Sequence, residues 1–67
     1  MTEQPRRPLP HGIGAPATRA LTEAGYPALD DLVGVSAKHL LALHGVGPKA
    51  IRVLRQELAR SGEALAD

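Results

Sequence analysis

The sequence has no cysteine and only one aromatic residue, Tyr26. Without cysteine, neither a disulfide framework nor a thiolate metal site can stabilise the chain. Proteins that hold single-stranded nucleic acid usually stack bases on several aromatic rings, so this mode of binding is excluded as well. The lack of cysteine fits a protein from a reducing compartment, and we expect a cytoplasmic location.

Long hydrophobic runs are also missing. No stretch approaches the roughly 18 apolar residues of a membrane span, and the opening residues lack the apolar stretch of a signal peptide. The formal net charge is only +1, so bulk electrostatics barely favours an acidic partner. We therefore expect a soluble protein without a membrane partner. Any attraction to nucleic acid must come from where individual charges lie.

The length, 67 residues, allows one small domain of modest stability. Residues 1–8 have no apolar periodicity and predict a disordered basic arm, either a plain solvated tail or a phosphate-binding arm. Gly62 is a typical helix stop, so we expect residues 62–67 to fray. The domain itself is predicted to span residues 9–61.

Apolar periodicity between prolines and glycines predicts an all-α domain of four or five short helices and no sheet. Pro16, Pro27 and Pro48 are predicted to begin the first, second and fourth helices. The third is predicted over Ala37–Leu43, with Ser36 as its N-cap. Gly25 and Gly34 end the first two. The predicted inward faces are Ala17, Ala20, Leu21 and Ala24; Leu29, Leu32 and Val33; Leu40 and Leu43; and Ile51, Leu54 and Leu58.

The most informative feature is an internal repeat. His11-Gly12-Ile13-Gly14, here called hairpin one, recurs 33 residues later as His44-Gly45-Val46-Gly47, hairpin two. The register continues without a gap through Ala17 and Ala50, Arg19 and Arg52, and Leu21 and Leu54. Ankyrin and tetratricopeptide arrays have similar periods, but two copies cannot build a solenoid. We predict one compact domain made of two related halves.

Each copy contains the pattern Gly-apolar-Gly-x-x-Ala. The glycines permit positive φ and let a foreign backbone approach without a Cβ in the way. The apolar residue, Ile13 or Val46, is expected to enter the core, and the alanine keeps two helices close. Each turn leads into a helix N-terminus, where unpaired N–H groups and the helix dipole favour an anion. The pattern therefore predicts phosphate binding.

The second copy, followed by Pro48-Lys49-Ala50 and the segment 51–58, resembles the helix-hairpin-helix motif of DNA repair and recombination proteins. The span from Gly12 to Leu58 is similar to the C-terminal domain of the bacterial RNA polymerase alpha subunit, which has the same tandem topology. The stretch Ala20–Tyr26 and residues 29–32 resemble that domain's first half. The resemblance implies contact with the backbone of duplex DNA across the minor groove, largely without sequence readout.

The first copy departs from the pattern because Pro16 stands where the second has Lys49. We therefore expect hairpin two to be the main DNA-binding site. In it, Gly45, Val46 and Gly47 would donate backbone N–H groups and Lys49 and Arg52 would supply positive charge. The secondary set is Gly12, Gly14 and Arg19. The alternative for both hairpins is a tight turn with no ligand.

No catalytic or metal-binding pattern is present. His11, His39 and His44 match no metal-ligand spacing, and the adjacent Asp30 and Asp31 diverge on a helix. We expect no enzyme activity, no cofactor, no metal and no small-molecule substrate. The leading hypothesis is a DNA-binding module that works within a larger complex, such as transcription or repair machinery. The rival is a protein-interaction domain with an exposed apolar patch near these residues: Tyr26, Leu41 and Val53.

Overall fold

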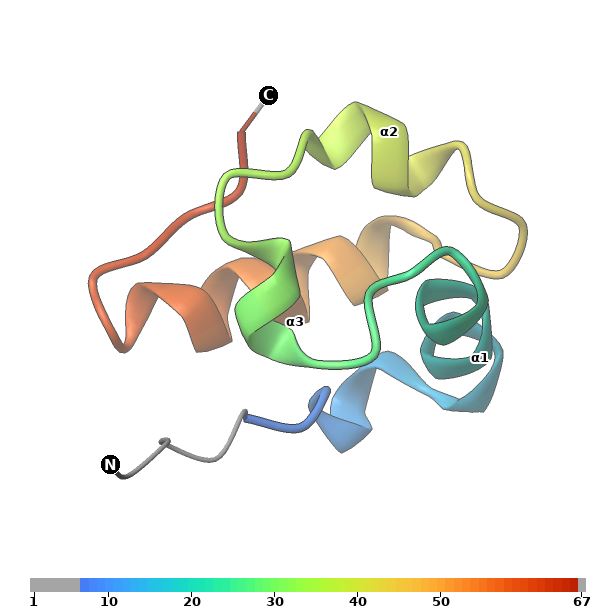
Figure 1. Ribbon diagram of the computed structural model, residues 1–67, viewed down its shortest axis with the longest axis horizontal. Coiled ribbons are helices and arrows are strands. Elements are labelled where there is room, and N and C mark those ends of the chain that lie inside the picture. The colour runs from blue at the N-terminus through green and yellow to red at the C-terminus, as the bar shows by residue number, and fades with distance from the viewer. Residues whose placement is uncertain (1–6, 67) are drawn as a thin grey trace.

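The computed structural model describes residues 7–66 and shows an all-helical domain, which confirms the predicted fold class (Figure 1). Its elements are the 3-10 turn η1 (His11–Ile13), α1 (Ala15–Glu23), the 3-10 turn η2 (Leu29–Leu32), α2 (Ala37–Leu41) and α3 (Pro48–Ala59). The three α-helices are fewer than the four or five helices predicted, because the segment after Pro27, predicted as the second helix, makes only a 3-10 turn. No strand forms within residues 7–66.

Proline and glycine set the helix ends as the sequence predicts. Pro16 lies in the first turn of α1, where its missing N–H costs no hydrogen bond. After α1, Gly25 takes a φ of 97°, its N–H donates to the Thr22 carbonyl, and the N–H of Tyr26 donates to the Leu21 carbonyl at 2.8 Å. This pair of bonds is a Schellman motif, which satisfies carbonyls at the helix end.

Two predicted helix boundaries are wrong. The segment after Pro27 remains extended, and η2 begins only at Leu29, where the Asp31 carboxylate accepts the N–H of Ala28 at 3.0 Å. Val33 then leaves the helix in an extended conformation and is 44% exposed, so it does not face inward.

The third predicted helix ends at Leu41 rather than Leu43. The N–H of Leu43 donates to the carbonyl of Leu40, three residues back, at 3.0 Å. This tighter spacing turns the chain out of the α-helix and into hairpin two, and it leaves Leu43 only half-buried.

The core is aliphatic and is shared by all the main elements. α3 runs through the middle of the domain with α2 along one side and α1 at one end (Figure 1). The largest fully buried side chains come from α1, η2, α2 and α3: Leu21, Leu32, Leu40, Leu54 and Leu58. Because this core links both repeat halves, neither half buries its apolar face alone.

Arg7, at the N-terminal end of the described chain, joins η2 to the segment after α3. Arg7 contacts the carboxylates of Asp30 and Glu63, and its guanidinium also donates to the Ser61 hydroxyl at 2.9 Å. Arg7, which is predicted to belong to a disordered arm, is instead held against η2, and residues 1–6 of that arm lie outside the described residues. No helix within residues 7–66 is long and apolar enough to cross a membrane.

The segment after α3, which is predicted to fray, returns to the domain instead. The N–H of Ala66 donates to the Val35 carbonyl at 2.9 Å, and the N–H of Ala37 donates to the Ala66 carbonyl at 2.7 Å. Leu65 is buried beside them. Residues 63–66 therefore cover the start of α2, a position that the residues after Gly62 do not reveal by periodicity.

Candidate nucleic-acid interface

Both hairpins share one backbone hydrogen bond across the turn. The N–H of Ile13 donates to the Pro10 carbonyl at 3.4 Å, and 33 residues later the N–H of Val46 donates to the Leu43 carbonyl at 3.2 Å. The first hydrogen bond of the following helix is matched at 3.1 Å in each half: Thr18 to Gly14, and Ile51 to Gly47. The sequence repeat is therefore also a repeat of local structure.

The two halves pack on each other reciprocally. A Cβ on Gly12 would lie 3.4 Å from a methyl group of Val53 on α3, and a Cβ on Gly45 would lie 3.6 Å from the Cβ of Ala20 on α1. Ala20 and Val53 are themselves 33 residues apart. The first glycine of each hairpin thus faces the same position on the other half's helix, as expected for two copies related by an approximate two-fold axis.

The apolar residue and the alanine of the pattern take their predicted places. Ile13 and Val46 are buried in the core, and so are Ala17 and Ala50. These four side chains fix each turn against the helix that follows it.

The glycines differ between the copies despite the identical pattern. In hairpin one the second glycine, Gly14, has the positive φ of 86°, whereas in hairpin two the first glycine, Gly45, has it at 98°. Gly47 is extended, with a φ of −114°. The N–H of Gly14 donates to the His11 carbonyl at 3.1 Å, so η1 consumes this donor.

Hairpin two leaves more donors free than hairpin one. Within residues 7–66, the backbone N–H groups of Gly45, Gly47 and Lys49 have no hydrogen-bond acceptor. Of the three predicted donors, Val46 uses its N–H in the turn, so its role is to anchor the hairpin. The N–H groups of Gly47 and Lys49 precede the first hydrogen bond of the 12-residue α3, where the dipole favours an anion.

Positive charge is concentrated beside hairpin two. Lys49, Arg52 and Arg55 are exposed, are spaced three residues apart on α3, and form no ion pair within the described residues. Spacing of three places them on one side of the helix. Arg55 is not among the residues predicted from the sequence, although the same spacing extends the series from Arg52.

Several carboxylates are paired elsewhere. Arg7 holds Asp30 and Glu63, and Arg60 contacts Glu57 at 3.6 Å. Hydrogen bonds with Glu63 and Asp30 raise the pKa of Arg7 above its ordinary value. These pairs engage carboxylates outside hairpin two.

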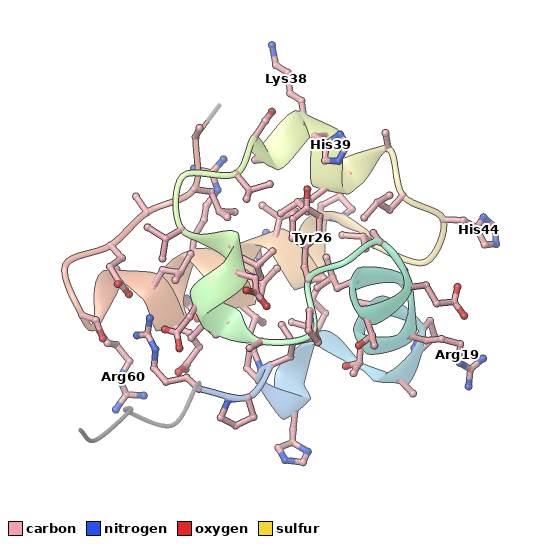
Figure 2. All side chains as sticks on the ribbon, in the orientation of Figure 1. Arg19, Tyr26, Lys38, His39, His44 and Arg60 are labelled. Atoms are coloured by element: carbon pink, nitrogen blue, oxygen red, sulfur yellow. The ribbon has the colours of Figure 1, made fainter. Side chains whose placement is uncertain are left out.

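A groove runs between α1 and hairpin two. Its lining residues come from both: Pro16, Arg19, Ala20, Glu23, His44 and Gly45. Figure 2 shows Arg19 and His44 projecting from the same side of the domain. Arg19, predicted to assist hairpin one, therefore lies beside hairpin two. Sequence spacing did not identify His44 as part of a site, because its neighbours come from the other half of the chain.

Two further features considered from the sequence are a metal site and an apolar patch. Within residues 7–66, no three histidine, cysteine or acidic side chains are grouped to hold a metal ion. The three residues suggested for an apolar patch differ in exposure. Leu41 is 41% exposed, but Val53 is half-buried against the core, and the ring of Tyr26 packs edge-on against His39 with centroids 6.3 Å apart.

Comparison with known proteins relates the domain to a DNA helicase. Over 53 residues the chain is 38% identical to the ATP-dependent DNA helicase Hel308 from Aeropyrum pernix. The match covers 79% of this chain and 7% of the helicase, so the chain spans less than a tenth of the length of that protein. No protein-family model and no solved structure matches the chain.

Proposed function

We propose that this chain is a tandem helix-hairpin-helix module that binds the phosphate backbone of duplex DNA, without enzyme activity of its own. The observation that carries the proposal is the combination, at hairpin two, of free N–H groups with unpaired cations. Gly47 and Lys49 offer the donors, and Lys49, Arg52 and Arg55 supply the charge. Hydrogen bonds and charge of this kind match a phosphate and carry no base information.

The similarity to a segment of a DNA helicase supports DNA as the partner. The resemblance to the C-terminal domain of the RNA polymerase alpha subunit supports a duplex and a backbone contact. The single aromatic ring argues against a stacking mode that would suit single strands.

The affinity of the isolated domain should be weak. With so few cations, we expect a dissociation constant in the non-specific range of about 10⁻⁴ to 10⁻⁶ M. Useful affinity would then require a larger assembly in the cytoplasm, such as transcription or repair machinery, that supplies further contacts. In that setting the domain would be one of several modules that bind the same duplex.

The direct test is a titration of the ¹⁵N-labelled chain with a mixed-sequence DNA duplex at low salt. We expect the largest amide shifts at Gly45, Gly47 and Lys49, with smaller shifts at Gly12. Raising the salt concentration should reverse them because counterions compete for the phosphates. Hairpin amides that remain unchanged at millimolar duplex, in a folded chain, would refute the proposal and favour the protein-interaction alternative.

A further inference from the structure

The groove between α1 and hairpin two has the chemistry of a second anion site. It is not formed by one repeat: Arg19 and Glu23 come from α1, whereas His44 and Gly45 come from hairpin two. The two segments come this close because Gly45 has no side chain, and the carbonyl oxygen of Pro16 lies 2.9 Å from where its Cβ would be.

We infer that Arg19 and His44 bind phosphates of the DNA strand that hairpin two holds, and that this binding strengthens when His44 is protonated. The inference rests on the proposed function, since it places the groove beside the free N–H groups of hairpin two. Arg19 is exposed and has no carboxylate partner within the described residues. Its planar guanidinium suits the oxygens of a phosphate, and a protonated imidazole adds two N–H donors.

Charge balance in the groove explains why the proton matters. The charged groups facing His44 are Arg19 and Glu23 of α1; the nearby Leu43 and Gly45 carry none. With a neutral imidazole, Arg19 and Glu23 cancel and the groove offers a phosphate no net attraction. With a protonated imidazole, the groove has a net charge of +1. Histidine is the side chain whose charge changes between pH 5 and 8.

The repeat identifies Glu23 as the residue that restrains binding at neutral pH. Thirty-three residues later, at the matched position of α3, the chain has the neutral Gln56. Glu23→Gln therefore gives α1 the side chain that α3 already has at this position, without a change of size. We expect this variant to bind duplex DNA more tightly at pH 8 and to depend less on acid.

The test measures the affinity of the full chain for a mixed-sequence duplex at pH 5.5 and pH 8.0, at one ionic strength. The wild-type chain should bind more tightly at pH 5.5. His44→Ala should remove most of that gain, and Arg19→Ala should weaken binding about two- to fivefold at both pH values, the range for one exposed charge contact. His39→Ala is the matched control, because His39 is exposed on α2 beside Tyr26, away from the groove (Figure 2).

The outcomes separate the two proposals. If Lys49→Glu weakens binding while His44→Ala keeps the wild-type pH dependence, hairpin two binds DNA and the groove inference is wrong. If Lys49→Glu has no effect and the hairpin amides do not shift, the proposed function itself fails. If His39→Ala removes the acid gain as fully as His44→Ala, the effect is not specific to the groove and the inference is overturned. Circular dichroism at both pH values confirms that each variant is folded.

Discussion

The carbonyl oxygen of Pro16 occupies the space in which a side chain on Gly45 would begin, 2.9 Å from the Cβ position. Hairpin two is therefore fitted to α1 at this residue. The glycine pattern has two separate causes here: Gly45 is required by packing and by its φ of 98°, whereas Gly47 is extended with no atom within 4 Å of its Cβ position. Gly47 thus has the space in which a phosphate could approach.

This difference predicts opposite results for two similar substitutions. Gly45→Ala should lower the free energy of unfolding by more than about 1 kcal/mol. A left-handed conformation alone costs an alanine roughly 1 to 2 kcal/mol, and the methyl group would also meet the carbonyl oxygen of Pro16. Gly47→Ala should leave the melting temperature nearly unchanged. Thermal denaturation followed by circular dichroism measures both. Equal stability of the two variants would contradict the packing of hairpin two on α1.

Gly47→Ala also provides a test of binding in a folded chain. If a phosphate approaches Gly47, the added methyl group should weaken binding to all duplex sequences alike, since a backbone contact carries no base information. Fluorescence anisotropy with two unrelated duplexes measures this. Sequence-dependent losses would contradict a pure backbone contact.

Leu54→Ala should destabilise the domain strongly. Leu54 is fully buried on α3, and truncation of a buried leucine costs about 2 to 5 kcal/mol. In a domain this small the loss could unfold most of the chain. Val33→Ala is the control, because Val33 is 44% exposed and should tolerate truncation. Urea denaturation of both variants gives the comparison, and similar midpoints would show that the core is assigned wrongly.

Lys49→Glu should weaken DNA binding without unfolding the chain, since Lys49 is exposed at the start of α3. The slope of log affinity against log salt should become shallower by about 0.9 for each phosphate that the variant no longer neutralises. Lys38→Glu makes the same charge change on α2, where the side chain projects away from Arg19 and His44 (Figure 2). An equal loss of affinity in both variants would mean that only net charge matters.

Arg7→Ala should lower the melting temperature more than Arg60→Ala does. Arg7 contacts Asp30 and Glu63 and joins the N-terminal segment to η2 and the chain after α3, whereas Arg60 has one contact with Glu57 at 3.6 Å. The raised pKa of Arg7 means that the guanidinium stays charged through neutral pH, so on the alkaline side its contribution is lost only in strong alkali. At 1 M salt the difference between the variants should shrink, because salt screens exposed ion pairs. A difference that is independent of salt would indicate that packing, rather than charge, makes Arg7 important.

The helical part of the fold could be read from local chemistry. Proline at a first turn and glycine after a last turn place α1 and α3 to within a few residues, because these residues restrict φ or tolerate positive φ whatever surrounds them. The boundaries of η2 and α2 could not be read in this way. They depend on the Asp31 carboxylate and on the bend at Leu43 that leads into hairpin two.

The sequence by itself determined the all-α class, the two related halves and the buried positions of Ile13 and Val46, because periodicity and a gapless repeat are local properties of the chain. Tertiary structure decided how the copies differ. The positive φ lies on Gly14 in one hairpin and on Gly45 in the other, and only Gly45 packs against the other half, at Pro16 and Ala20. Tertiary structure also brings Arg19 to the same groove as His44, since residues 25 positions apart meet only when α1 folds against hairpin two.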